Sequence, residues 1–181
     1  MLKHTVFAIG IGMLVLFLYL FQYTGAFKNV VVATDMRGPY SVIYKDFTGP
    51  YHKIVPTIEE VETWSKAHGL KCRLSFGEYF DDPNQVEEGR LHSRGGCLID
   101  SLAGEKLNVE LPQDFKTDII ASTKAVVALF DGAPGIGPLK VYPKAEDYIL
   151  KNNLKKKGSV LEIYEIFDQK SMQTTYIWPI N

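Results

Sequence analysis

Two stretches, VIYKDFTGPY at residues 42–51 and VVALFDGAPG at residues 126–135, decide the fold of this chain. Each begins as an apolar strand, reaches a turn with glycine and proline, and runs into a helix. The helices end near Gly69 and Asn153, so both halves follow the same plan. Matched residues lie 83 or 84 positions apart, which predicts a duplicated unit: Val42 and Val126, Gly49 and Gly132, Trp64 and Tyr148, Leu70 and Leu154.

Each unit reads as strand, helix, strand, strand, and the two units predict an α+β fold. We expect one antiparallel sheet with two helices on one face and a ligand groove on the other. The domain covers residues 28–181, with halves at about 28–105 and 106–181. The expected elements are strands at about 29–47, 71–80 and 90–100 with a helix at 54–68, then strands at 115–130, 158–167 and 172–179 with a helix at 138–153.

The first 27 residues have a different character from the rest of the chain. Residues 5–27 carry no charge, and as a helix they span about 34 Å, enough to cross a hydrocarbon core of about 30 Å. We expect an N-terminal single-pass anchor. The alternative is a signal peptide cleaved near Thr24-Gly25-Ala26, although the apolar run is longer than the usual 7–15 residues. The balance of Lys3 against Lys28 and Arg37 leaves the side of the domain open.

Several classes of function find no support in the sequence. A formal net charge of −1 argues against a nucleic-acid binder. The four histidines, at positions 4, 52, 68 and 92, have no metal-ligand spacing, so we expect no metal. There is no phosphate-binding glycine loop and no G-x-S-x-G nucleophile motif, and we expect no cofactor.

An ordered set of short motifs resembles the GyrI-like small-molecule-binding family, the effector-binding domain of multidrug-responsive regulators. The resemblance covers residues 28–181. An anchor directly before such a domain is similar to the membrane-anchored group that includes the testis-expressed reticulophagy receptor. Those receptors carry a long tail with an autophagosome-binding motif, which this sequence lacks, so that role is not expected. The matching motifs are FTGPY at 47–51, the Trp64 helix ending in Gly69-Leu70, YFDDP at 79–83, Leu111-Pro112, LEIY at 161–164 and YIWPI at 176–180.

In the resembled family, the groove binds flat, often cationic molecules between aromatic walls and a buried glutamate. The strand at 158–167 carries a matching residue. Side chains alternate along a strand, so Leu161, Ile163 and Phe167 are expected beneath the helices. Glu162 and Tyr164 are then left on the groove face. A carboxylate between apolar neighbours is costly without a partner, which a ligand cation beside an aromatic ring would supply.

The repeat suggests further groove residues. A register of 84 relates Glu162 to Glu78, which would then flank the same groove, although the family usually has an apolar residue there. Tyr176 and Trp178 share one face of the last strand and are candidate walls, as is Tyr44. Ordinary core packing is the alternative for these aromatic residues, and bonds to polar neighbours are the alternative for the glutamates.

The two cysteines, Cys72 and Cys97, fall on strands that should be antiparallel neighbours. In an oxidising compartment they would form a cross-strand disulfide, and in the cytosol they would be buried thiols.

These patterns favour a membrane-tethered binding module for a small aromatic or cationic ligand over an enzyme. The first alternative is a hydrolase of electrophilic small molecules that uses Glu162 as general base. The second is a membrane-bound protein-interaction adaptor, whose protein partner the sequence does not reveal.

Overall fold

The computed structural model describes residues 2–99, 109–133, 135–166 and 172–181. This part of the chain has three α-helices and one eight-stranded sheet in which neighbours pair antiparallel, so the expected α+β fold is confirmed. The boundary expected between the halves near residue 105 lies outside the described residues. The elements are α1 (Leu2–Tyr23), β1 (Val31–Arg37), β2 (Tyr40–Thr48), α2 (Val55–Ala67), β3 (Cys72–Tyr79), β4 (His92–Ile99), β5 (Phe115–Ile120), β6 (Thr123–Asp131), α3 (Gly137–Lys151), β7 (Val160–Ile166) and β8 (Met172–Pro179), with 3-10 turns at Tyr51–Lys53 and Glu88–Arg90.

The two longest predicted strands are each bent into two. The order across the sheet is β1-β6-β8-β7-β3-β4-β2-β5. The β1–β6 pairing ends at Arg37 with Thr123 and resumes in unbroken register in β2–β5, at Tyr40 with Ile120. Gly38 permits the bend: its φ is +87°, and a Cβ there would lie 3.2 Å from the Ala121 carbonyl. The paired long strands therefore link the two ends of the sheet and curl it.

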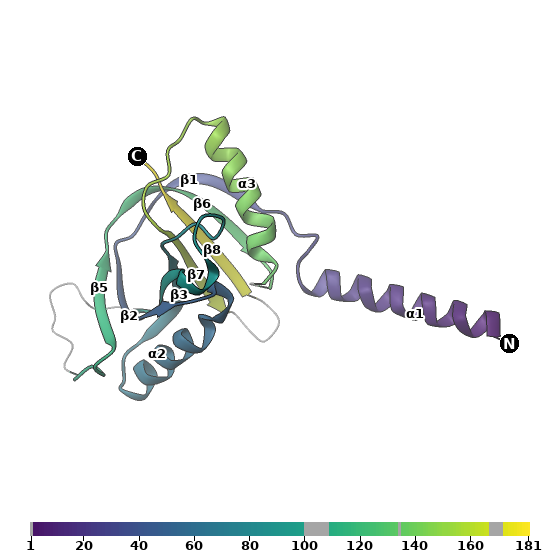
Figure 1. The fold of residues 1–181 in the computed structure, drawn as a ribbon, viewed down its shortest axis with the longest axis horizontal. Helices are drawn as coiled ribbons and strands as arrows, with labels where there is room; N and C mark the ends of the chain where they lie inside the picture. The colour runs from purple at the N-terminus through teal and green to yellow at the C-terminus, as the bar shows by residue number, and fades with distance from the viewer. Residues whose placement is uncertain (1, 100–108, 134, 167–171) are drawn as a thin grey trace.

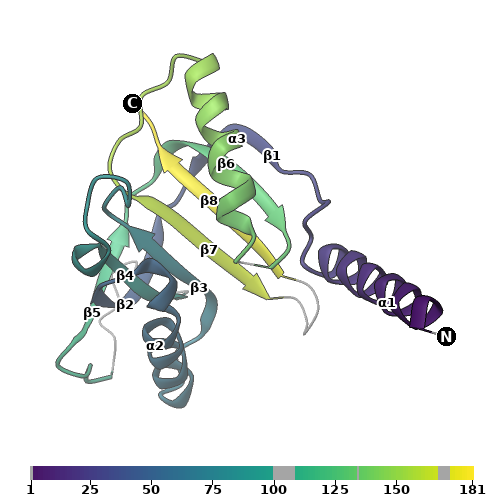
Figure 2. The same ribbon diagram turned by 45° about the vertical axis from the view of Figure 1, so that its right-hand side comes forward.

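Both domain helices lie on one face of the sheet, as expected. In α2, Pro56 in the first turn and buried residues three and four apart, Ile58, Val61 and Ser65, favour the helix. In α3 the buried positions recur every four residues: Gly137, Val141, Ala145 and Ile149. Helix α2 packs mainly on β4, β2 and β3, whereas α3 packs on β6 and β1. The middle strands β7 and β8 pass between the two helices in Figure 2.

The sheet is buried on both faces. On the helical face, α2 covers a cluster around Ile43 and Cys97, and α3 covers another around Val126 and Phe130. The opposite face, inside the curl, is filled by a third cluster: Val42, Phe76, Leu98, Ala125, Val127, Leu161, Ile163 and Ile177. Little of the sheet is therefore left as an open apolar surface.

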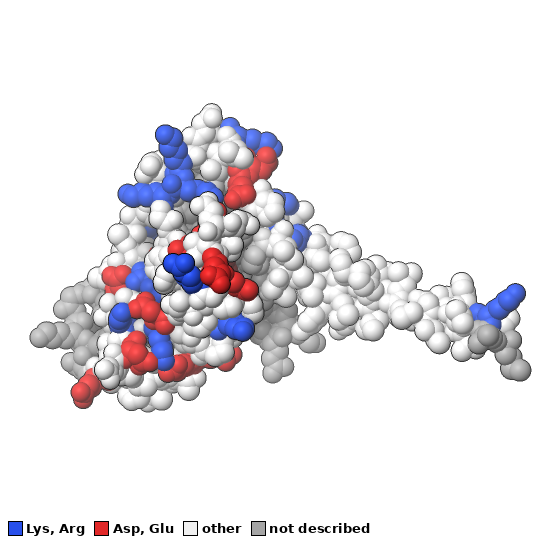
Figure 3. Space-filling model, viewed as in Figure 1, with Lys and Arg blue, Asp and Glu red and all other residues white. Residues whose placement is uncertain are grey.

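Helix α1 projects from the domain without joining its core (Figure 1). Residues 3–23 are long and apolar enough to cross a membrane, and none of the span is buried. Figure 3 shows the helix as an uncharged rod with Lys or Arg only at its outer tip. By length and composition it fits either an anchor or a signal sequence.

Candidate ligand site

Glu162 lies on the helical face of the sheet, not on the opposite face where the sequence placed it. The Tyr142 hydroxyl of α3 donates a hydrogen bond of 2.9 Å to Glu162 Oε1. Leu161 and Ile163 point to the other face and pack in the core cluster inside the curl. Alternation divided the strand into the correct two sets, but it does not say which set meets the helices, because the curled sheet buries both faces. Phe167, expected beneath the helices, lies outside the described residues.

The carboxylate of Glu162 is buried without a cation. The residue is 6% exposed, and its second oxygen accepts a 3.2 Å hydrogen bond from the Tyr164 hydroxyl. None of the ion pairs in the described part of the chain includes it. Burial raises the pKa of Glu162 to about 7, although the hydroxyls of Tyr142 and Tyr164 act in the opposite direction.

A line of tyrosines extends from Glu162 toward α2. The hydroxyls of Tyr164 and Tyr79 lie 2.8 Å apart, and the Tyr79 ring packs edge-on against Tyr51 at 4.7 Å. The Tyr51 hydroxyl is fixed by two 2.9 Å hydrogen bonds with the backbone of Asp81. Burial, and next the nearby Glu162 charge, raise the pKa of Tyr79 and of Tyr164, so both hydroxyls remain protonated.

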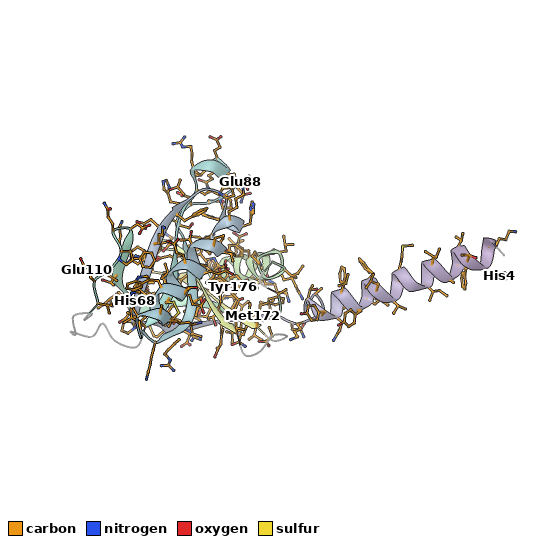
Figure 4. The ribbon with its side chains drawn as sticks, turned by 90° about the horizontal axis from the view of Figure 1, so that it is seen from below. His4, His68, Glu88, Glu110, Met172 and Tyr176 are labelled. Atoms are coloured by element: carbon orange, nitrogen blue, oxygen red, sulfur yellow. A yellow bond between two sulfur atoms is a disulfide. The ribbon has the colours of Figure 1, made fainter. Side chains whose placement is uncertain are left out.

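On the other side of Glu162, beneath α3, lie aromatic rings. Tyr176 and Trp178 stack with centroids 6.0 Å apart, and Tyr142 stands edge-on to Trp178 at 5.3 Å. Figure 4 shows Tyr176 in the middle of the domain. Gly137 makes room for it, because a Cβ there would lie 2.0 Å from the Tyr176 hydroxyl. That hydroxyl is buried and has no hydrogen-bond partner among the described residues. We call the set of Tyr51, Tyr79, Tyr142, Tyr164, Tyr176, Trp178 and Glu162 the tyrosine cluster.

Glu78 and Tyr44, also predicted for the groove, lie on the opposite face of the sheet. Glu78 accepts a 2.6 Å hydrogen bond from Arg94 Nε and a short one from the Ser159 hydroxyl. Arg94 also binds Asp118 at 2.8 Å, and its guanidinium lies 4.5 Å from the centre of the Tyr44 ring. The structure therefore does not bring Glu78 or Tyr44 together with Glu162.

The repeat register of 84 residues explains why Glu78 was expected on the same face as Glu162. In the β3–β7 ladder, Gly77 is opposite Glu162, so Gly77 shares its face while Glu78 points away. A shift of one residue exchanges the two faces of a strand. A separation of 85 instead relates Gly77 to Glu162 and Tyr79 to Tyr164, the two tyrosines whose hydroxyls meet.

Sequence reasoning missed Tyr142 and missed the role of Tyr79. Tyr142 follows the buried Val141 in α3, at the border of the helix's buried face, and this position alone does not reveal a partner on β7. Tyr79 could have been found from the repeat, had an odd register been tested on the strands.

A cavity of about 30 Å³ lies on the opposite face, near the bend of the long strands, and its lining includes Glu78, Ser159, Arg37 and Tyr40. This is the volume of about one water molecule, far below the several hundred Å³ of an organic-ligand pocket. Among the residues that the structure describes, no three potential metal ligands gather together.

Cys72 and Cys97 are joined in a disulfide, with Cα atoms 5.3 Å apart. The bond lies beneath α2, in the cluster that also holds Val61 and Phe115, with Trp64 packed against it.

Comparisons with known proteins agree on the fold. The chain matches no protein-family model, and no curated protein matches it in sequence. A crystal structure of the EcmrR C-terminal domain superposes with a TM-score of 0.63 and 18% identity, covering 84% of this chain and 98% of that one. EcmrR in a complex with DNA gives 0.65 and 14%, covering 98% and 68%. SAV2435 bound to tetraphenylphosphonium gives 0.51 and 12%, covering 83% and 94%. The chain thus shares its fold with the EcmrR C-terminal domain and SAV2435, and the fold that the resemblance implied is confirmed.

Proposed function

We propose that residues 28–181 form a binding module for a small aromatic or cationic organic molecule, tethered to a membrane by residues 5–27. The environment of Glu162 supports this function: among the described residues, its buried carboxylate is held only by hydroxyl groups. A buried charge without a counter-ion is costly, and a bound cation removes that cost. Aromatic rings such as Tyr142 and Trp178 would further attract the cation.

Access to Glu162 requires movement in the tyrosine cluster. Tyr142 and Tyr164 bind one carboxylate oxygen each and cover the group. Both are partly exposed, whereas Tyr176 and Trp178 are fully buried and would remain as a fixed wall. A ligand therefore replaces two hydroxyl contacts with its own charge and rings.

The ligand affinity should depend on pH, because only ionised Glu162 attracts a cation. With a pKa of about 7, the ionised fraction changes about tenfold between pH 6 and pH 8. Tetraphenylphosphonium is a suitable probe, since it is a lipophilic cation bound by SAV2435, a protein of the same fold.

The test is a titration of residues 28–181 with tetraphenylphosphonium, followed by calorimetry at pH 6 and pH 8. We expect about tenfold tighter binding at pH 8, and we expect Glu162→Gln to lose both the affinity and the pH dependence. Glu78→Gln is the matched control, because Glu78 is equally buried but lies on the other face. Unchanged binding by Glu162→Gln would remove Glu162 from the site.

Hydrolysis of an electrophilic small molecule is the second candidate. A pKa of about 7 suits Glu162 to act as general base at neutral pH, with a hydrogen-bonded hydroxyl beside it in Tyr164. Turnover of a small epoxide that disappears in Glu162→Gln would favour the enzyme. If neither binding nor turnover occurs, the adaptor interpretation gains support.

The tether is proposed from the length, composition and exposure of α1. Alkaline carbonate extraction of cell membranes, followed by N-terminal sequencing, tests it. An anchored chain stays in the membrane fraction with residues 1–27 intact, whereas a chain that begins near Phe27 and is released has lost a signal peptide.

A further inference from the structure

The junction between α1 and the domain is built from specific contacts. The backbone N–H of Ala133 donates a 3.1 Å hydrogen bond to the Thr24 carbonyl. Lys140 of α3 donates to three carbonyl groups in the segment that follows α1: Gly25 at 3.4 Å, Ala26 at 2.5 Å, and Lys28. These carbonyl groups lie in the turn after α1, and an ammonium group is a strong, charge-assisted donor to them. These hydrogen bonds therefore fix the segment that connects α1 to the domain.

The same junction places one end of the domain next to the C-terminal end of α1. Helix α3 begins beside α1 and runs away from it (Figures 1 and 2). Lys140, in its first turn, contacts the segment after α1, so Leu139 belongs to the near end of the helix and Leu150 to its far end. The C-terminal end of β7 and the start of β8 also lie at this end of the domain. Ile166 of β7 pairs with Met172 of β8, and Figure 4 shows Met172 on the side of the domain that faces α1.

Large apolar side chains are exposed at this end. Phe27 is 63% exposed, Leu139 75% and Ile166 63%. Single exposed apolar residues are common, but these three lie at the end of the domain from which an apolar helix of membrane-spanning length projects. We call this surface the base.

We propose that the base rests in the headgroup layer of the bilayer that α1 crosses. The proposal rests on the membrane anchor of the proposed function, and the occupant is lipid because the surface is continuous with α1. Aromatic and aliphatic groups next to a span are favoured at this depth. Gly137, which lies over the Tyr176 hydroxyl, is two residues from Leu139, so the first turn of α3 connects the base with the Tyr176 end of the tyrosine cluster.

Nitroxide labels on the full chain in phosphatidylcholine vesicles test the docking. Leu139→Cys and Leu150→Cys are a matched pair: both leucines are 75% exposed and on one helix, about 16 Å apart. The native cysteines are bonded to each other, which leaves the new thiol for the label. We expect at least fivefold lower accessibility to an aqueous nickel reagent at 139 than at 150, and higher accessibility to oxygen. Equal accessibility at both positions would overturn the proposal.

A label at Met13→Cys in α1 separates failure of the docking from failure of the anchor. Met13 is 62% exposed and lies in the middle of the span. A lipid-buried label at 13 with an aqueous label at 139 contradicts the docking and leaves the anchor standing. An aqueous label at 13 contradicts both. Protection at 139 with dipolar broadening between labels indicates a second copy of the chain on the base and also overturns the proposal.

Lys140 provides a second test. In the Leu139→Cys background, Lys140→Ala removes the contacts with the carbonyls of residues 25, 26 and 28, so we expect the accessibility at 139 to rise severalfold. Lys140→Arg retains a donor and should keep the label protected. Near-UV circular dichroism confirms that each variant is folded. An unchanged label in Lys140→Ala would show that the junction does not hold the base on the membrane.

Discussion

Two buried glutamates, one on each face of the sheet, differ in how their charge is met. Glu162 is 6% exposed and Glu78 is 7% exposed. Glu78 has Arg94 at 2.6 Å, and Arg94 continues to Asp118, so the charges on that face form a connected ion-pair network. In the part of the chain that the structure describes, Glu162 has only the hydroxyls of Tyr142 and Tyr164. At nearly equal burial, the carboxylate on one face is neutralised by an ion pair, whereas the carboxylate on the other face has no positively charged partner among the described residues.

This contrast indicates which of the two buried carboxylates is available to a ligand. An ion pair with its own cation offers nothing to a second cation, and removing one partner is costly. A carboxylate held by hydroxyls can exchange them for a cation, since the hydroxyls are neutral and can turn to other partners.

The largest effect is expected on the Glu78 face. Arg94→Met leaves Glu78 buried beside a neutral group and removes the partner of Asp118. We expect the free energy of unfolding to fall by about 3–5 kcal/mol, the usual effect of breaking a buried pair from one side. Denaturant unfolding with the disulfide intact measures it.

Lys116→Met is the control for Arg94→Met. Lys116 also pairs with an aspartate, Asp46, but both side chains are more than half exposed, so little change is expected. An Arg94 variant as stable as the Lys116 variant would contradict the assignment of Glu78 to a structural ion pair.

The next effect is a pH-dependent stability carried by Glu162. Its pKa is about 7 in the folded chain, against an ordinary value of 4.5. Between these values the folded state holds a proton that the unfolded state has lost, so the free energy of unfolding falls as pH rises from 4.5 to 7. The full loss is about 3 kcal/mol.

Unfolding of wild type and Glu162→Gln at pH 4.5, 6 and 7.5 measures this contribution. The glutamine variant cannot ionise at position 162, so it should lack that part of the slope, whereas Glu78→Gln should retain it. An identical slope in Glu162→Gln and wild type would show that another group carries the dependence.

The sequence predicted the elements well and the assignment to faces poorly, for a physical reason. Apolar periodicity, turn residues and the duplication located the segments of the eight strands, with β1–β2 and β5–β6 each taken as one long strand, and both domain helices. They also selected Glu162. Which side of β7 meets the helices depends on how the sheet curls. The curl is set by the pairing of β1 with β6 and of β2 with β5, strands that lie far apart in the sequence. A repeat register wrong by one residue was enough to put Glu78 beside Glu162.

A smaller effect is expected from Tyr142→Phe, which removes the shorter of the two hydrogen bonds to Glu162. This bond lowers the pKa of Glu162 against the effect of burial, so its loss should raise that pKa above 7 by about 1–2 pH units. The midpoint of tetraphenylphosphonium binding against pH measures the change. Tyr148→Phe is the matched control, because Tyr148 also lies on α3 but its hydroxyl meets Thr34. Equal midpoints in the two variants would contradict the bond.

The smallest effect is expected from Tyr79→Phe, which tests whether the tyrosines act one by one or as a chain. Tyr79 meets Tyr164 at 2.8 Å, and Tyr164 in turn donates to Glu162 at the longer distance of 3.2 Å. If each hydroxyl acts only on its neighbour, Tyr79→Phe shifts the pKa of Glu162 by no more than about 0.5 units, less than Tyr142→Phe does. A shift as large as that of Tyr142→Phe would mean that the hydrogen bonds polarise one another from Tyr79 to Glu162. The pKa of Glu162, and with it the attraction of this face for a cation, would then depend on the whole line of tyrosines and not only on the two that bind the carboxylate.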